Sequence, residues 1–216
     1  MLIAVLVYDH VSALEVVVPV EVLGRLPGFE PVLVGARRGM VRCDSAVRLV
    51  ADASLDEVVA PDVVVVPGWS GATQDHLLRP GAVQDWLRAT DERTTWTATS
   101  GTGSLLLAGA GLLAGRPATT HWLTTDRLAA LGAVPTGARV VRDGKYLTAA
   151  GATAGIDMAL ALAALLAGDQ TAKAVQLLLE YDPQPPFDSG SITTAPSGVV
   201  ASMRALRDFI VDGTRS

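Results

Sequence analysis

The chain has 216 residues, of which 50% are hydrophobic and 18% are charged, and its formal net charge is −5 at pH 7. This length supports one substantial hydrophobic core and is short for two, so we expect residues 1–216 to form a single domain. The acidic balance and the scattered Lys and Arg residues leave no electrostatic footprint for nucleic acid, and we expect no nucleic-acid partner.

Along the chain, apolar runs that end in turn residues alternate with segments of helical spacing. The expected strands are Leu2–Tyr8, Pro31–Gly35, Met40–Arg42, Val47–Val50, Asp62–Pro67, Thr94–Ser100, Val134–Arg142 and Tyr146–Ala149. The expected helices are Ala13–Arg25, Gln74–Leu78, Ala82–Ala89, Thr102–Leu113, His121–Leu131, Ala154–Ala167, Thr171–Tyr181 and Met203–Val211. A Pro-rich stretch, Asp182–Phe187, begins an extended tail. Buried strands that alternate with helices predict an α/β fold, with a mostly parallel sheet covered by helices on both faces.

Short apolar runs and a single cysteine indicate where the protein resides. The N-terminal run Leu2–Val7 is too short for a signal sequence, and Met158–Ala167 is too short for a membrane span. Cys43 is the one cysteine and cannot form an internal disulfide. We therefore expect a soluble, cytoplasmic protein that does not contact a membrane. The histidines, whose spacing is unlike that of metal ligands, are His10, His76 and His121, and we expect no metal.

In a sheet of this kind, a ligand binds beyond the carboxyl ends of the strands. Four segments of this chain converge there: the first helix, the loop after Pro67, the turn at Gly101 and the segment that begins at His121. We expect the functional site where these segments meet.

The turn between the strand Thr94–Ser100 and the next helix has the pattern of a nucleophile elbow. In such a sharp turn the corner side chain is pushed into the pocket, and backbone N–H groups at the helix start face an incoming anion. The corner residue here is Gly101, which carries no thiol or hydroxyl. Chemistry in this pocket must then proceed without a covalent intermediate at the corner.

Glu15 is the strongest candidate for catalysis, because it lies just inside the first helix within a run of Ala, Leu and Val residues. Removing a carboxyl from water raises its pKa toward neutrality, which suits a general acid or base. The alternative is a solvated or capping glutamate at the helix start. We interpret Glu21, further along the same helix, as structural.

Other candidate residues surround these two. We expect a backbone N–H of Thr102 to lie opposite the N–H groups of Gly68 or Trp69, so that they cradle an anion or a carbonyl oxygen. The Thr102 hydroxyl has the alternative role of capping the helix. His121 either orients the ligand or is a core histidine that bonds to backbone. Trp69 and Trp122 either form an aromatic wall for an apolar substrate or belong to the core.

Three further polar residues are weaker candidates. A serine-hydrolase elbow requires glycine at position 98, where this chain has alanine. Ser100 lies one residue before the corner, so we expect it to point away from the pocket. Cys43 lies in the expected hairpin, and Asp157 follows Gly155; we expect neither to be catalytic.

A series of short motifs is collinear with one known family. These motifs are Leu14-Glu15, Pro19–Leu23, Val66–Gly68, Thr102–Leu105, Ala110–Leu113, Ala118–Trp122, Val140–Gly144, Thr153–Asp157, Leu179–Tyr181 and Pro185–Phe187. Together they resemble the isonitrile hydratase branch of the ThiJ/PfpI superfamily, from the first strand to about Val200.

The resemblance implies a flavodoxin-like three-layer α/β sandwich, usually a homodimer with its active site near the subunit interface. It also implies hydration of an isonitrile to an N-substituted formamide. In that reaction an elbow cysteine attacks the isonitrile carbon, and an acid on the first helix handles protons. The cysteine position corresponds to Gly101, and the acid position to Glu15, which is one methylene longer than the family's usual aspartate. Trp69 and Val18 stand where the family commonly has small residues.

The absent cysteine has three interpretations: a disabling substitution in a hydratase, a noncatalytic binding protein for small molecules, or an enzyme that holds its substrate without a covalent bond. We favour the third. Glu15 would then be the proton donor or base, without a cofactor, for hydration, dehydration, cyclisation or isomerisation of a small, largely apolar molecule. Regulators with this fold carry an added helix-turn-helix domain, for which we expect no room in this chain.

Overall fold

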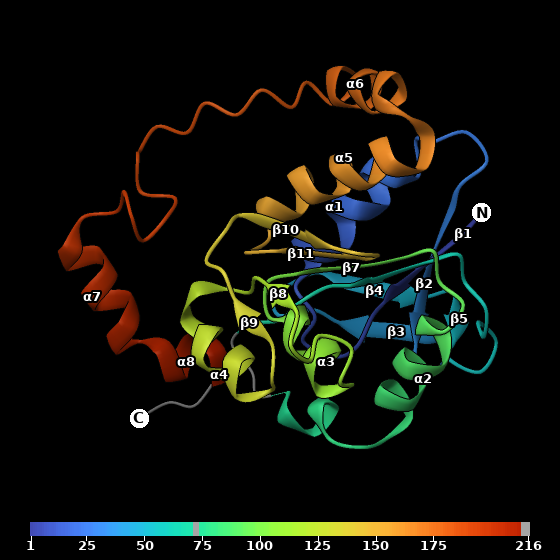
Figure 1. Cartoon of the computed structure of the whole chain (residues 1–216), viewed down its shortest axis with the longest axis horizontal. Coiled ribbons are helices and arrows are strands. Elements are labelled where there is room, and N and C mark those ends of the chain that lie inside the picture. Colours follow the sequence, from blue (N-terminus) through green and yellow to red (C-terminus); the bar gives the residue numbers. More distant parts are fainter. Residues whose placement is uncertain (71–73, 213–216) are drawn as a thin grey trace.

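Seven strands form the main sheet of the protein, in the order β10-β11-β7-β6-β1-β2-β5 (Figure 1). The computed structural model describes residues 1–70 and 74–212. The strands of this sheet are β1 (Leu2–Leu6), β2 (Glu30–Gly35), β5 (Ala53–Ser54), β6 (Val63–Val66), β7 (Trp96–Ser100), β10 (Val140–Asp143) and β11 (Tyr146–Ala149). Neighbouring strands are parallel except β10 and β11, which are antiparallel. The order β2-β1-β6-β7-β11 is that of a flavodoxin-like sheet, so the predicted fold is confirmed.

Helices cover both faces of this sheet. The α-helices are α1 (Ala13–Leu23), α2 (Ala82–Asp91), α3 (Gly103–Gly109), α4 (Thr125–Ala130), α5 (Ala154–Ala167), α6 (Asp169–Leu178), α7 (Ser197–Ala205) and α8 (Arg207–Asp212). Two short 3₁₀ helices are η1 (Asp75–Leu78) and η2 (Trp122–Thr124). In Figure 1, α1 and α5 lie on one side of the sheet, and α2 and α3 lie on the other. This arrangement makes three layers.

The two central strands are apolar throughout because helices cover both of their faces. All four residues of β6 are buried valines, and four of the five residues of β1 are buried. β-Branched side chains suit such a doubly covered strand, since they pack well on both pleated surfaces. The carboxyl ends of β1, β6 and β7 are neighbours at one edge of the sheet.

Helix α1 forms despite a sequence of low helix propensity. It contains the valines Val16–Val18, and Pro19 cannot donate a backbone hydrogen bond to the carbonyl of Glu15 four residues earlier. The buried face of α1 packs against α5 and the sheet, so tertiary packing holds the helix. Glu15 lies on that buried face, and the packing therefore takes its carboxyl out of water.

Two small sheets lie beside the main one. The predicted hairpin around Cys43 is confirmed as β3 (Gly39–Arg42) and β4 (Arg48–Ala51), which pair antiparallel. The second small sheet pairs β8 (Pro117–Ala118) with β9 (Val134–Pro135). Neither β5 nor β8 was expected, because a strand of two residues has no periodic pattern.

Several expected elements differ from the structure. The helix expected over His121–Leu131 is the 3₁₀ helix η2 followed by α4, and the helix expected over Gln74–Leu78 is the 3₁₀ helix η1. The strand expected over Val134–Arg142 is interrupted between β9 and β10, where Gly137 has a φ of +69°. The helix expected over Thr102–Leu113 ends at Gly109, shortly before Gly111 turns the chain with a φ of +82°. The last helix, expected over Met203–Val211, is two helices, α7 and α8, that meet at Leu206.

The segment between α6 and α7 is an extended tail, as its prolines predict. It has no helix or strand from residue 181 to residue 196 and arches away from the sheet in Figure 1. Large apolar side chains at the end of α6 and on the tail are exposed: Leu177, Leu178, Phe187 and Ile192. Among the helices that the structure describes, none is long and apolar enough to cross a membrane.

Candidate active site

The site is built where the neighbouring strands β1, β6 and β7 end. Helix α1, which follows β1, supplies Glu15. The loop after β6 supplies Gly68, and the last residue of β7 is Ser100. These three residues meet, although 53 and 85 positions separate Glu15 from Gly68 and Ser100.

The carboxyl group of Glu15 is buried and fixed by two hydrogen bonds. Glu15 is only 7% exposed to solvent. The N–H of Gly68 and the hydroxyl of Ser100 both donate to Glu15 Oε2, each at 2.7 Å. Burial raises the pKa of Glu15, the two hydrogen bonds lower it, and the nearby Asp44 carboxylate raises it; the net pKa lies above the ordinary value. The geometry thus suits a group that both gives and takes a proton.

Ser100 is not among the described residues that line the pocket, as expected, but its hydroxyl reaches the pocket acid Glu15, a contact that was not expected. Successive side chains of a strand alternate between the faces of the sheet. Thr99 Oγ1 donates to the Val66 carbonyl at 2.7 Å, whereas Ser100 lies against Gly155 of α5, on the face that α1 also covers. Glu15 comes from that same face, so the residue before the corner reaches it.

Gly101 forms the corner of the turn between β7 and α3, as predicted. Its φ of +52° is in the left-handed region, which glycine adopts without strain. Its N–H donates to the Ala149 carbonyl at 3.0 Å, and its carbonyl accepts from the Thr120 hydroxyl at 2.9 Å. The corner backbone is therefore tied down on both sides.

Gly68 and Trp69 do not form the expected cradle of N–H groups for a ligand opposite Thr102, so that prediction is wrong. The Gly68 N–H donates to Glu15, and the Trp69 N–H donates to Thr102 Oγ1 at 2.7 Å. Both donors thus already have acceptors within the protein. A Cβ atom at Gly68 would lie 2.6 Å from the Thr102 nitrogen and 2.9 Å from Glu15 Oε2, so the loop can approach this closely only with glycine at position 68.

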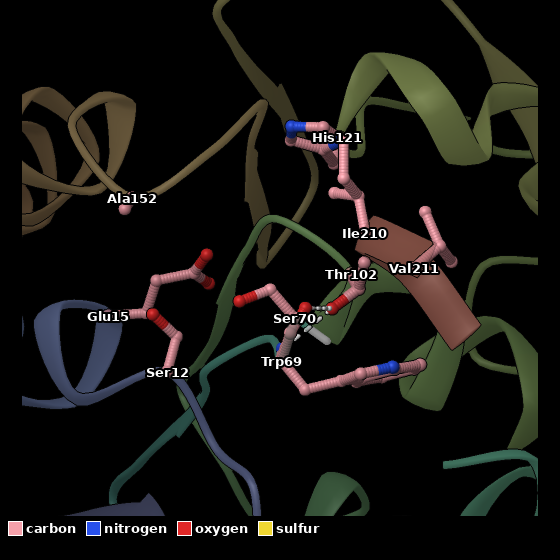
Figure 2. A pocket seen from close by; sticks show the side chains of 9 residues that line it. All are labelled: Ser12, Glu15, Trp69, Ser70, Thr102, His121, Ala152, Ile210 and Val211. Carbon is pink, nitrogen blue, oxygen red and sulfur yellow. Dashed lines mark hydrogen bonds between the residues drawn. The ribbon is translucent and has the colours of Figure 1, made fainter. Parts of the chain in front are cut away.

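The Thr102 hydroxyl holds the loop after β6 and does not cap α3. It accepts from the Trp69 N–H at 2.7 Å and donates to the Trp69 carbonyl at 2.9 Å (Figure 2). No side-chain cap is formed at the start of α3, so the capping interpretation is wrong. Tyr8 supports the same loop, since its buried hydroxyl donates to the Pro67 carbonyl at 2.6 Å.

The two tryptophans do not form one aromatic wall. Trp69 is 3% exposed, lines the main pocket and meets the ring of Tyr8 edge-on at 6.4 Å. Trp122 is half-buried and instead lines a separate hollow with residues of the tail and α7. The wall expected from both side chains is wrong, because Trp69 and Trp122 line different hollows.

His121 lies at the pocket, at the start of η2. Burial lowers its pKa, which keeps the imidazole neutral near pH 7. Nδ1 accepts from the Leu123 N–H at 3.4 Å, so the proton of the neutral ring is assigned to Nε2. In Figure 2, His121 lies across the pocket from Glu15.

The pocket between these groups has a volume of about 230 Å³. Its lining residues are Ser12, Glu15, Trp69, Ser70, Thr102, His121, Ala152, Ile210 and Val211 (Figure 2). Ile210 and Val211 come from α8, which Arg207 anchors by donating to the Leu123 carbonyl at 2.8 Å and to Asp126 at 2.7 Å. The expectation that four segments converge was therefore incomplete, since the loop between β11 and α5, through Ala152, and helix α8 also line the pocket.

Two of the weaker candidates lie apart from this pocket. Cys43 is not among the residues that line the pocket. Its thiol has a raised pKa, mainly because of burial and to a smaller extent because of the Asp44 carboxylate. Asp157 pairs with Arg139 and accepts from the Tyr181 hydroxyl at 2.7 Å, which ties the start of the tail to α5. Within residues 1–70 and 74–212, no three His, Cys, Asp or Glu side chains gather in a way that could hold a metal ion.

Comparison with known proteins identifies the family of this chain. The DJ-1/PfpI family model matches residues 1–165. The chain belongs to the DJ-1/PfpI family. The family and the fold inferred from the sequence motifs are thereby confirmed.

Relatives of this DJ-1/PfpI chain include an enzyme and a regulator. Isonitrile hydratase of Pseudomonas putida is 43% identical over 199 residues, which are 92% of this chain and 86% of the relative. An HTH-type transcriptional regulator of Pseudomonas aeruginosa is 33% identical over 172 residues, which are 77% of this chain and 49% of the regulator. Among solved structures, a ThiJ/PfpI family protein from Pseudomonas syringae matches with a TM-score of 0.92 at 35% identity, covering 96% of this chain and 86% of the other. Drosophila melanogaster DJ-1beta matches with a TM-score of 0.74 at 26% identity, covering 83% and 97%.

Removing the Ser100 hydroxyl from this DJ-1/PfpI chain will raise the pKa of Glu15 further. The hydrogen bond that Ser100 donates stabilises the ionised carboxylate, so Ser100→Ala favours the protonated form. A pH titration of the Glu15 side-chain carboxyl by ¹³C NMR measures this shift. Ser104→Ala is the matched control, because the buried Ser104 hydroxyl donates to the Thr119 carbonyl. An unchanged or lower pKa in Ser100→Ala would contradict the assignment.

Glu15 will also make the stability of the fold depend on pH. Because the pKa of Glu15 is raised by folding, its contribution to stability is full below the unfolded pKa and is lost as the pH rises through the folded pKa. Glu15→Gln, which remains neutral, should therefore gain stability relative to the unaltered protein as the pH rises through that window. Urea unfolding from about pH 4 to about pH 8 measures the difference. Glu21→Gln is the control, since Glu21 is exposed; a difference that does not vary with pH would refute the expectation.

Proposed function

We propose that the pocket adds water to a small, uncharged and largely apolar molecule of the isonitrile type, with Glu15 as the proton donor and without a covalent enzyme intermediate. The observation that carries this proposal is a buried carboxyl with a raised pKa beside a turn whose corner is glycine. A raised pKa favours the protonated form of the carboxyl, and this is the form that a general acid needs. The similarity to the hydratase of Pseudomonas putida supports the type of reaction.

The pocket favours an uncharged ligand. No Lys or Arg is present among the nine described residues that line it. An anion bound there would face Glu15 without a compensating cation, which is unfavourable in a buried site. Trp69, Ile210 and Val211 add apolar surface. Since pockets for drug-sized ligands occupy about 300–1,000 Å³, a volume of about 230 Å³ suits a smaller molecule.

The proposed hydration balances with water as the one co-substrate. The carboxylic acid of Glu15 gives its proton to the isonitrile carbon, which leaves a nitrilium ion next to the Glu15 carboxylate. Water then adds to that carbon and returns a proton to the carboxylate, giving an imidic acid that tautomerises to the N-substituted formamide. The carboxylate stabilises the cationic intermediate through its charge, so no bond to the protein is needed.

His121 supplies the second polar group of the proposed reaction. Its neutral ring offers the Nε2–H, and it faces Glu15 across the pocket (Figure 2). We assign to it the orientation of the attacking water. The acid and the water-binding group then lie on opposite sides of the ligand.

The second candidate function is noncatalytic binding of a small molecule. The similarity to the HTH-type transcriptional regulator of Pseudomonas aeruginosa favours it, although this chain spans about half of that protein. The same pocket would then act as a sensor site. Binding without turnover separates this function from the first.

Replacing Glu15 will abolish hydration if the proposal is right. We expect Glu15→Gln to lower kcat/KM for an aryl isonitrile by about 10²–10⁴-fold, which is the usual effect of losing a general acid. Formamide production measured by liquid chromatography provides the rate. Glu21→Gln is a matched control on the same helix, because Glu21 pairs with Arg25 at the surface and is remote from the pocket. Undiminished turnover in Glu15→Gln would exclude Glu15 as the acid, whereas binding of the isonitrile with no turnover in the unaltered protein would favour the sensor.

We also propose that the protein is a homodimer in which the tail contacts the partner. Phe187 is 77% exposed and Leu177 is 79% exposed, so within one chain these apolar side chains remain in water. Replacing both with serine should shift the protein toward monomer in size-exclusion chromatography with light scattering. Met40→Ser is the control, since Met40 is 63% exposed but lies on the β3–β4 hairpin. A dimer that tolerates the tail substitutions, or an unaltered protein that is monomeric, would count against this interface.

A further inference from the structure

The indole N–H of Trp69 has no hydrogen-bond acceptor among the residues that the structure describes. Trp69 is 3% exposed, and its Nε1 atom is buried. Of the buried side-chain nitrogen and oxygen atoms in residues 1–70 and 74–212, two lack a partner, Trp69 Nε1 and Gln84 Oε1. Trp69 lines the main pocket, whereas Gln84 does not. A buried donor without an acceptor is costly, because folding removes the water to which it was bonded.

The second buried tryptophan of the described chain shows the usual state of such a group. Trp86 is 6% exposed, and its indole N–H donates to the Val58 carbonyl at 2.7 Å. A buried indole N–H generally has a partner of this kind. The unpartnered indole N–H of Trp69, at the wall of a pocket, therefore indicates that its acceptor belongs to a ligand.

Contacts with the protein hold Trp69 in this place. Its backbone is bonded on both sides to Thr102 Oγ1, which accepts from the N–H and donates to the carbonyl. Its ring meets the ring of Tyr8 edge-on at 6.4 Å. Turning the indole into solvent would give up the burial of a large apolar ring, so the N–H does not gain a water molecule in that way.

A ligand acceptor reaches this N–H when a side chain of the pocket wall moves, since the nitrogen is covered by protein. Ile210 and Val211 line the same pocket, and in Figure 2 they lie on the side of the indole that carries the nitrogen. Both come from the end of α8, whereas Arg207 fastens this helix at its start. A change of rotamer in these two side chains opens the way without moving the indole.

We propose that the indole N–H of Trp69 binds an uncharged oxygen atom, of an ether or a carbonyl, on the body of the ligand. An anion is disfavoured, because Glu15 is the charged partner that it would meet and the described lining has no Lys or Arg. In Figure 2 the indole nitrogen and the Glu15 carboxyl lie apart, with Ser70 between them in the view. The oxygen is therefore separate from the atom that faces Glu15.

Two isonitriles that differ in one atom of a ring test this assignment. Their choice rests on the proposed function, whereas the role of Trp69 concerns binding alone. Cyclohexyl isonitrile has a CH₂ group where a tetrahydropyranyl isonitrile has an ether oxygen, and two positional isomers place that oxygen across the ring or one atom nearer. Calorimetry gives the dissociation constants in Glu15→Gln, in which the proposed hydration does not consume the probes.

Adding Trp69→Phe keeps an aromatic ring and removes the N–H. We expect the preference for the better tetrahydropyranyl isomer over cyclohexyl isonitrile to fall by about 3–10-fold, the usual effect of losing one neutral hydrogen bond. The ratio of the two dissociation constants cancels the packing that both probes lose. Trp86→Phe is the matched control, because its indole N–H bonds within the core, and it should leave the preference unchanged. An unchanged preference in Trp69→Phe would overturn the proposal.

A second measurement observes the donor in the unaltered protein. The NMR signal of the Trp69 indole N–H should move downfield when the preferred tetrahydropyranyl isonitrile is added, and less with cyclohexyl isonitrile. If neither isonitrile binds, tetrahydropyran alone is the probe; no shift with any ether would overturn the proposal. A preference that depends on Trp69 without formamide production would retain the donor and reject the proposed hydration. Turnover that depends on Glu15, with no such preference, would reject the donor alone.

Discussion

The site depends on keeping one carboxyl group out of water at the junction of three strands. A buried carboxyl is costly unless hydrogen bonds replace those of water, and Gly68 and Ser100 supply two. To donate from this position, the loop after β6 must come within contact distance of α1 and α3. Tyr8 holds the backbone of that loop at Pro67, and Thr102 holds it at Trp69. The buried polar groups around Glu15 therefore bond to the acid or to the loop that holds it, and not to a ligand.

Most of the fold could be predicted because its patterns are local. The apolar run of β6 and the alternation of strands with helices lead directly to a doubly covered parallel sheet. The strands β5 and β8 were not predicted, because a strand of two residues is too short to show an alternating pattern of apolar side chains. The division of the last helix into α7 and α8 also escaped prediction. The break at Leu206 contains no proline or glycine, so the sequence offered no signal for it.

The residues that meet at the candidate site could be predicted from their type and their position in the chain. The sheet order brings Glu15 and Gly101 together, as expected from their places after β1 and β7. Hydrogen-bond partners were not predictable in the same way. Whether the Trp69 N–H serves a ligand or Thr102 depends on loop geometry of a few ångströms, which residue identity does not encode. Ser100 could have been found, because strand alternation places it on the face covered by α1.

Helix α8 shapes the pocket without belonging to the core that stabilises the sheet. Val211 and Leu123 are both buried, yet both lie outside the main hydrophobic cluster. Arg207 fastens α8 to the surface by polar contacts. A substitution at Ile210 or Val211 therefore alters which molecules fit while the sheet, the turn and the buried acid remain as they are. Substitutions in α8 can therefore change ligand preference separately from the stability of the sheet.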